Sequence, residues 1–269
     1  MGQKVGIFVG EKGNWTFFDH IFNDLNAHYE TKVFKVKTFN TPLLHGRLNR
    51  WAYQNGIRAI LKSVDIAFFE WASELLIPAS HMPKYCPIVT RLHSYELFAW
   101  APDVNWDNVD KIILVSKAMQ TNFCEIFPKH AHKTSVIYNA KPLDTFTPIT
   151  RDFRFDLGML GTINPRKRTY EIILMLKALR EQGQEAQLHI AGGRHHAPDM
   201  DEYYVATHRL VEKLALQGHV TFYDHIGNTA EWLQQRDIFI SNSYSSIRSI
   251  KCDIVIIVIF ISSILSVSS

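Results

Sequence analysis

Short β-branched runs alternate with stretches of helical periodicity along most of this chain, and this alternation limits the fold more than any other feature. The expected strands of the first half are Lys4–Val9, Lys32–Val36, Asp65–Phe69, Ile88–Leu92, Lys111–Val115 and Thr134–Tyr138. The helices expected between them are Trp15–His28, Leu48–Lys62 and Lys117–Phe127. Apolar strands separated by helices are typical of a parallel sheet covered on both faces. The sequence therefore predicts an α/β fold.

A turn-rich segment with Pro142 and Pro148 follows Asn139 and is typical of a linker. The alternation then resumes, with strands expected at Arg154–Leu160, Leu188–Ala191, Val220–Tyr223 and Asp237–Ser241, and helices at Thr169–Gln182, Tyr203–Leu216 and Thr229–Gln235. This pattern predicts a second doubly wound unit. We expect an N-terminal domain over residues 1–145 and a C-terminal domain over residues 150–244.

Residues 245–269 do not continue the alternation of strand and helix patterns, because they are rich in isoleucine and serine. Their apolar run is about a dozen residues long, shorter than the roughly 20 residues that span a bilayer as a helix. We favour a non-homologous tail over a membrane anchor. Such an apolar β-forming segment is an aggregation hazard where it is exposed.

Charge and cysteine content narrow the classes of protein. The 269 residues carry a formal net charge of +3, which suits an enzyme of anionic substrates or a contact with an anionic membrane surface but does not indicate a nucleic-acid partner. Cys86, Cys124 and Cys252 are widely spaced and odd in number, which argues against a disulfide framework. No signal-peptide pattern precedes the strand at Val5–Val9, so we expect a cytoplasmic location.

The segment Phe155–Tyr170 combines an apolar strand, glycines and three consecutive cations at the start of a helical pattern. Gly158 and Gly161 allow a tight turn, and a helix start stabilises a phosphate through its free N–H groups and its dipole. The three cations are Arg166, Lys167 and Arg168. Two interpretations stay open from these residues alone, a cradle for a diphosphate or a solvated surface patch.

Other common motifs are absent from the sequence. Only Gly10 and Gly13 stand where a nicotinamide dinucleotide site requires Gly-x-Gly-x-x-Gly, and no Walker sequence is present. Two groups of histidines stand close in sequence, His130 with His132 and His189 with His195 and His196. Neither has the paired cysteines or the His-Glu-x-x-His helix of a zinc site, so we predict no metal. No Gly-x-Ser-x-Gly elbow supports a serine hydrolase.

Seven segments in order from Pro87 to Tyr244 nevertheless resemble the retaining GT-B glycosyltransferases of family four. These segments are Pro87–Glu96, Ile112–Met119, Val136–Phe146, Gly161–Arg168, His189–Gly193, Val220–Ile226 and Asp237–Tyr244. The resemblance implies two Rossmann-like doubly wound domains that face each other across a cleft. The C-terminal domain would hold most of a nucleoside-diphosphate sugar, the N-terminal domain would hold the acceptor, and no cofactor beyond this co-substrate is implied.

The resemblance also gives the cradle a ligand. Lys167 matches the family lysine that contacts the donor pyrophosphate, whose negative charge grows as the glycosidic bond breaks. The family usually carries an arginine directly after the glycine that matches Gly161, but this chain has Thr162 there. We expect Arg166 or Arg168 to substitute for that arginine. In the first domain, Gly10 and Gly13 match a loop near the diphosphate.

His93, Ser243 and Tyr244 match family positions near the donor. His93 matches a strand-end histidine that approaches the donor sugar, although a histidine buried there and satisfied by a backbone carbonyl is the alternative. Glu96 either orients His93 or caps the next helix. Ser243 and Tyr244 stand where the family loop begins its approach to the sugar and nucleotide.

The match stops at Tyr244, and the pair of glutamates that the family carries next is absent from residues 245–269. We therefore expect an incomplete second domain whose sheet ends in an unpaired apolar edge. The implied reaction is transfer of a hexosyl unit to a hydroxyl of a saccharide or lipid-linked saccharide, with reduced activity in this chain. A sugar-nucleotide epimerase or hydrolase, and a non-catalytic nucleotide- or membrane-binding module, remain alternatives, and a peripheral membrane contact is left open.

Overall fold

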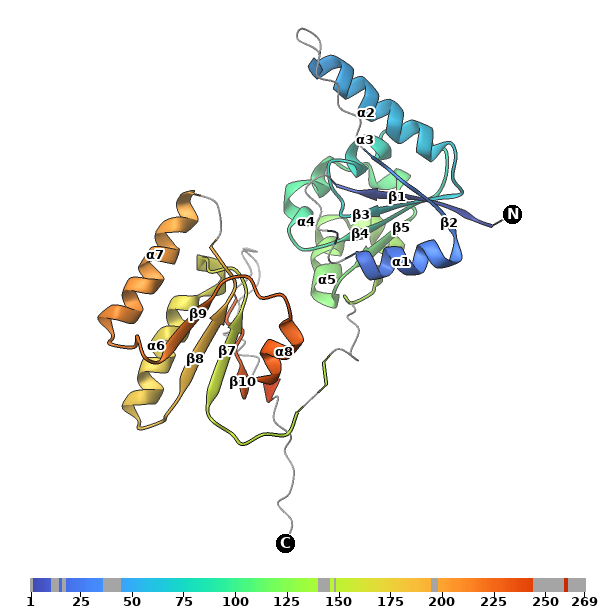
Figure 1. Cartoon of the computed structure of the whole chain (residues 1–269). Helices are drawn as coiled ribbons and strands as arrows, with labels where there is room; N and C mark the ends of the chain where they lie inside the picture. The colour runs from blue at the N-terminus through green and yellow to red at the C-terminus, as the bar shows by residue number, and fades with distance from the viewer. Residues whose placement is uncertain are drawn as a thin grey trace. The chain divides into compact units, whose positions relative to one another are not determined.

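The computed structural model describes residues 2–10, 15, 18–35, 45–139, 146–147, 149–194, 198–243 and 259–260, with the backbone alone at 45–47, 198–200 and 259–260. The chain divides into two compact units, Met1–Ala140 and Lys141–Ser269 (Figure 1). Both units are mixed α/β structures built on parallel sheets, which confirms the predicted fold class. Among the described residues, no helix is long and apolar enough to cross a membrane.

The first unit is a six-stranded parallel sheet in the order β2-β1-β3-β4-β5-β6. Its strands are β1 (Lys4–Val9), β2 (Glu30–Val33), β3 (Ile66–Glu70), β4 (Ile88–Leu92), β5 (Lys111–Leu114) and β6 (Thr134–Val136). Its helices are α1 (Asp19–His28), α2 (His45–Leu61), α3 (Leu76–Ser80), α4 (Glu96–Ala99) and α5 (Lys117–Ile126), with short 3₁₀ turns at Ala101–Asp103, Trp106–Asn108 and Pro128–Lys133. The strand order reverses between β1 and β3, and the carboxyl edge at such a switch point is where ligands bind in open α/β sheets.

Alternate residues of these strands point to opposite faces of the sheet and supply separate cores. Phe8, Phe69 and Leu114 face the side of α2, α3 and α5 and belong to the larger buried cluster. Ile7 and Phe18 belong to a smaller cluster on the side of α1. Figure 1 shows α1 and α2 on opposite sides of this sheet.

The second unit has the strand order β11-β10-β7-β8-β9. Its elements are β7 (Asp156–Leu160), a 3₁₀ turn (Pro165–Lys167), α6 (Thr169–Glu181), β8 (Gln187–Ala191), α7 (Pro198–Lys213), β9 (Val220–Tyr223), α8 (Thr229–Gln234), β10 (Ile238–Phe239) and β11 (Ile259–Phe260). Strands β7 to β10 pair in parallel, and β11 pairs antiparallel with β10. The expectation of an unpaired edge beside β10 was therefore wrong, because Ile259–Phe260 supplies backbone partners there.

Helices α6 and α7 cover one face of the second sheet and α8 lies on the other (Figure 1). Ile173 and Leu176 of α6 join Leu188 and Ile190 of β8 in the core between them. Gly158 lies within β7, where an added Cβ would stand 2.8 Å from the Cγ of Arg236. Gly158 therefore allows close packing beneath α8 and is not part of the tight turn that the sequence suggested.

Local conformations explain where the observed elements depart from the expected bounds. Strand β7 begins at Asp156 instead of Arg154, because Phe155 has a φ of 61°, which an extended strand does not allow. Helix α7 begins at Pro198, since proline is favoured in the first helical turn. Helices α5 and α8 are capped by side chains, with Ser116 Oγ accepting from the N–H of Met119.

Candidate functional site

The turns after β7 and β8 place two glycines side by side at the carboxyl edge of the second sheet. Gly161 has a φ of 142°, and its N–H donates to the carbonyl of Ala191 at 2.8 Å. Gly192 has a φ of 128°, and an added Cβ there would stand 2.3 Å from the carbonyl oxygen of Gly161. Both positions therefore need glycine, for conformation and for close contact of the two backbones. This edge lies beside the switch between β7 and β10, where the strand order reverses.

Lys167 lies over the turn at Gly161. Asn164 Oδ1 accepts from the backbone N–H of Lys167 at 3.2 Å and fixes the 3₁₀ turn that carries the lysine. A Cβ built on Gly161 would be 3.0 Å from the Cε and 3.3 Å from the Nζ of Lys167. Burial lowers the pKa of Lys167, and the charge of Arg166 lowers it further. Among the described residues no carboxylate forms an ion pair with Lys167, so its ammonium group is available to an anion.

Arg168 and Arg166 differ from Lys167 in their surroundings. Arg168 adopts the left-handed conformation, with a φ of 53°, and its Nε donates to Glu171 Oε1 at 2.8 Å. The other carboxylate oxygen of Glu171 accepts from Asn242 Nδ2 at 2.9 Å. Burial raises the pKa of Glu171, but these hydrogen bonds outweigh it and leave the pKa below its ordinary value. Arg166 is exposed beside them.

The start of α6 is less open than the sequence suggested. The backbone N–H of Tyr170 donates to the hydroxyl of Tyr203 at 3.1 Å, so α7 already satisfies one of the N–H groups expected to be free. Arg166 and Lys167 lie on a 3₁₀ turn before α6, and Arg168 stands between this turn and the helix, so none of the three cations is in the first turn of α6. The Asn242 contact joins the start of α6 to the segment after β10, and Ser243 is exposed next to it. Tyr244 lies outside the described residues.

In the first unit, Gly10 directly follows β1 and packs against the loop after β3. An added Cβ would stand 2.8 Å from Glu74 Oε1 and 2.9 Å from Ser73 Oγ. The absence of a side chain at Gly10 therefore lets the ends of β1 and β3 approach each other closely. Gly13 lies outside the described residues.

His93 belongs to a buried polar cluster at the ends of β3 and β4. Its Nε2 lies 3.0 Å from Glu70 Oε1 and 3.3 Å from Arg91 Nε, and Arg91 Nη2 lies 3.0 Å from the same carboxylate oxygen. The His93 ring stacks on Trp71, with centroids 4.1 Å apart. Glu70, Arg91 and His93 are 0, 4 and 9% exposed. The alternative of a histidine satisfied by a backbone carbonyl is not what the structure shows, because the ring nitrogen meets side chains.

Glu96 lies beside this cluster without contacting the His93 ring by a hydrogen bond. Its Oε1 accepts from the backbone N–H of His93 at 3.4 Å, and burial raises the pKa of Glu96. Its Oε2, the Oε2 of Glu70 and the Nε1 of Trp71 are buried with no hydrogen-bond partner in the described part of the chain. Glu96 therefore acts on the His93 backbone, and Glu70 is the residue that meets its ring.

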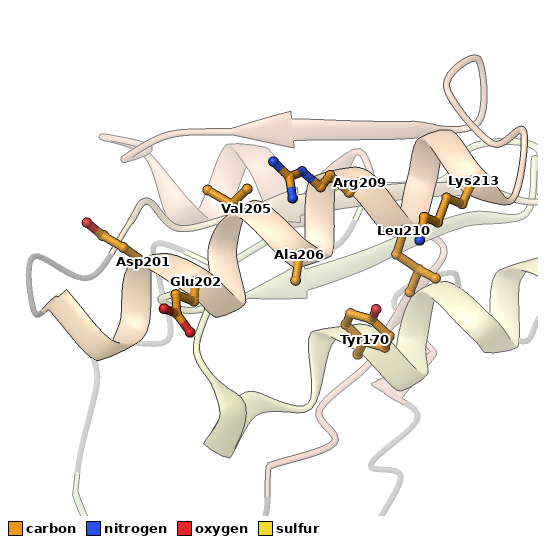
Figure 2. A pocket seen from close by; sticks show the side chains of 8 residues that line it. All are labelled: Tyr170, Asp201, Glu202, Val205, Ala206, Arg209, Leu210 and Lys213. Carbon is orange, nitrogen blue, oxygen red and sulfur yellow. The ribbon is translucent and has the colours of Figure 1, made fainter.

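A separate hollow of 590 Å³ opens between α6 and α7. Figure 2 shows the ring of Tyr170 below α7, facing Leu210, with the carboxylates of Asp201 and Glu202 toward the start of α7. None of the predicted site residues lines this hollow. Its lining carries both signs of charge and lies on the helices instead of at the ends of the strands. It is therefore a poorer candidate for the ligand site than the carboxyl edge of the sheet.

His189 and His130, two of the histidines considered for a metal, have other partners, whereas His195 and His196 lie outside the described residues. His189 Nδ1 lies 3.1 Å from the hydroxyl of Tyr223 and Nε2 lies 3.4 Å from Asp156 Oδ1, while burial lowers the pKa of His189. The side chain of His130 is 3.9 Å from a carboxylate oxygen of Asp107. The described residues contain no group of three or more histidine, cysteine, aspartate or glutamate side chains that could hold a metal.

Solved structures share this architecture. The Anabaena protein HepE in complex with UDP and glucose superposes with a TM-score of 0.66 at 16% identity, covering 90% of this chain and 74% of that chain. The lipopolysaccharide outer core galactosyltransferase WaaB superposes with a TM-score of 0.62 at 18% identity, covering 90% and 73%. The fold is that of the GT-B glycosyltransferases. At these identities the likeness establishes the fold alone.

Sequence comparison adds a weaker link. The putative glycosyltransferase YtcC of Bacillus subtilis (strain 168) is 26% identical over 43% of this chain. The chain matches only 32% of the length of that protein. No family model matches the chain.

Sequence reasoning missed Glu70, Arg91 and Trp71, although two of them carry a visible signal. Glu70 ends an apolar strand and Arg91 lies inside another, and charged residues are rare within buried parallel strands unless they are paired. The structure pairs Glu70 with Arg91 in register across β3 and β4. That register is not visible from the sequence of either strand.

Proposed function

We propose that this chain binds a nucleoside-diphosphate sugar and belongs to a retaining glycosyltransferase that moves a hexosyl unit to a hydroxyl acceptor. The observation that carries the proposal is Lys167, a half-buried lysine without a carboxylate partner among the described residues, positioned over the Gly161 turn at the switch point of the second sheet. Its low pKa reflects the desolvation that a bound anion would offset. The structure of HepE was solved in complex with UDP and glucose, which supports a uridine nucleotide as the probe.

The residues of the second unit take distinct roles in this proposal. Lys167 and the exposed Arg166 stabilise the diphosphate, which gains negative charge as the sugar leaves. Arg168 orders the site indirectly, because it is bound to Glu171, which in turn holds Asn242 beside Ser243. In the first unit, Gly10 and His93 stand at the carboxyl edge of their sheet, where Gly10 lets the backbone approach the donor and His93 meets a hydroxyl of its sugar. The acceptor in this proposal is a hydroxyl of a saccharide or lipid-linked saccharide.

Turnover by this chain is expected to be slow. Residues 245–269 contain no glutamate, and the family to which the sequence is similar uses a glutamate pair there to hold the sugar and the ribose. Binding is therefore a better test of the proposal than catalysis. Efficient transfer from any sugar nucleotide by the purified 269-residue chain would contradict the expected impairment.

Calorimetric titration with UDP tests the diphosphate site. We expect Lys167→Ala to weaken UDP binding by roughly 10- to 100-fold, since a hydrogen bond to a charged group contributes about 1.5–3 kcal/mol. Lys177→Ala is the matched control, because Lys177 is also on the surface of the second unit but is paired with Glu181 on α6. Uridine should bind both variants equally weakly. Equal affinity of the wild type and Lys167→Ala for UDP would remove the basis of the proposal.

A further inference from the structure

Glu70 contacts Arg91 and His93 through a single carboxylate oxygen. Its Oε1 lies 3.0 Å from Arg91 Nη2 and 3.0 Å from His93 Nε2, while its Oε2 has no hydrogen-bond partner among the described residues. We infer that Glu70 is a positioning residue that keeps the proton of His93 on Nε2, so that Nδ1 is the hydrogen-bond acceptor offered to a ligand. The use of Nδ1 rests on the proposed function, but the position of the proton does not.

Strand register fixes the two members of this pair. Glu70 of β3 lies directly opposite Arg91 of β4, and His93 follows two residues later on the same face. The Arg91 guanidinium balances the charge of the buried Glu70 carboxylate, which would otherwise be costly to desolvate. The Glu70 carboxylate is therefore placed to accept from the imidazole.

The distances favour a proton on Nε2. Such a proton points into the 3.0 Å contact with the Glu70 carboxylate and forms a charge-assisted hydrogen bond. A proton on Nδ1 would instead set the Nε2 lone pair against a carboxylate oxygen at 3.0 Å. It would gain only the longer hydrogen bond from Arg91 Nε at 3.3 Å, which a proton on Nε2 gives up. The hydrogen bond made by one ring nitrogen selects the tautomer and so defines the role of the other nitrogen.

Trp71 fixes the plane of the imidazole. Its ring stacks on His93 at an interplanar angle of 22°, and its backbone has a φ of 71°. A tryptophan in this conformation is strained, and such strain persists only where surrounding contacts enforce it. The imidazole is therefore held at its edge by Glu70 and at its face by Trp71.

This arrangement limits the ligand group that His93 recognises. An Nδ1 acceptor pairs with a group that donates a proton, such as a sugar hydroxyl, whereas an ionised phosphate has only acceptor oxygens. An imidazole with its proton on Nε2 therefore suits a hydroxyl of the sugar or acceptor and not an ionised phosphate. The substrate class recognised at the end of β4 is a neutral hydroxyl group.

Histidine-selective ¹⁵N NMR of the whole chain tests the tautomer, with the His93 signals assigned by their loss in His93→Ala. We expect the wild type to show a protonated Nε2 and an unprotonated Nδ1. Glu70→Gln should move the proton to Nδ1, because the amide can donate to Nε2. Glu96→Gln is the matched control and should keep the wild-type pattern, since Glu96 contacts only the backbone of His93. A wild-type proton on Nδ1, or an unchanged tautomer in a folded Glu70→Gln, would overturn the inference.

A second arm separates this inference from the proposed function. Affinities for UDP and UDP-glucose should differ in the wild type, and the difference should be lost equally in Glu70→Gln, His93→Ala and the double variant. If the wild type binds neither nucleotide while the tautomer responds to Glu70→Gln, the proposed function fails and the positioning role stands. If the affinity difference survives in Glu70→Gln, the positioning role fails. Should Glu70→Gln not fold, the wild-type spectrum alone decides.

Discussion

At the scale of single residues, the strongest constraint in the second unit is the contact between Gly161 and Gly192. A side chain at Gly192 would collide with the Gly161 carbonyl at 2.3 Å in a backbone conformation that side chains rarely adopt. We expect Gly192→Ala to lower the free energy of unfolding by more than about 3 kcal/mol, because strain and clash add. Urea denaturation measures this change. Gly193→Ala is the control, since its Cβ would meet no atom within 4 Å, and equal losses in both variants would contradict the argument.

Single residues also show the limits of sequence reasoning at the candidate site. The sequence pointed to Gly161 and Lys167, because a glycine turn followed by cations is a local pattern, and the structure brings them into contact. It could not reveal that Glu171 joins Arg168 to Asn242, since only the fold places Asn242 beside that carboxylate. Glu70 was missed for the same reason, because its contact with His93 depends on the register of two strands.

At the scale of elements, helices α6 and α7 end in the same hydrogen-bonded motif. In α6 the N–H of Gln184 donates to the carbonyl of Leu179 at 3.1 Å, and in α7 the N–H of Leu216 donates to Val211 at 2.9 Å. The left-handed residue of this motif is Gly183 in α6, with a φ of 82°, but Ala215 in α7, with a φ of 55°. Glycine is the usual residue here because it has no Cβ to strain.

This difference predicts opposite effects of two substitutions. Ala215→Gly should raise the free energy of unfolding of the second unit by about 1 kcal/mol, since it removes the cost of the left-handed conformation at an exposed position. Gly183→Ala should lower it by a similar amount, because no neighbouring atom lies near the added Cβ and only the backbone strain changes. Chemical denaturation measures both. A loss of stability in Ala215→Gly would show that the entropy of glycine outweighs the strain.

Element boundaries were predictable where hydrophobic period and capping agree. Strands β1, β4 and β9 have the bounds expected from the sequence, since each is an apolar β-branched run. The early end of α7 was not predictable, because periodic apolar residues continue through Leu216 while Ala215 turns the backbone out of the helix. The short helices α3 and α4 have too few residues to show a period.

At the scale of the whole molecule, each unit has its own buried core. The clusters around Phe69 and Ile7 contain only residues of the first unit, and the cluster around Leu188 contains only residues of the second. The sequence indicated this division because the alternation of strands and helices stops near Asn139 and then resumes. It indicated an apolar β-forming segment after residue 244 but not the pairing of Ile259–Phe260 with β10, because that segment lacks the alternating pattern.

Separate cores predict that residues 1–140 fold without the rest of the chain. The isolated fragment should unfold in one cooperative thermal transition and show a near-ultraviolet circular dichroism signal, because Trp106 is buried against Phe123 at 5.0 Å between ring centroids. Phe123→Ala in the fragment should cost about 3–5 kcal/mol, which is a large share of the typical stability of a domain, and should abolish that signal. Phe98→Ala is the matched control, since its ring is 48% exposed. A non-cooperative transition in the unmodified fragment would mean that the first core alone does not specify a stable structure.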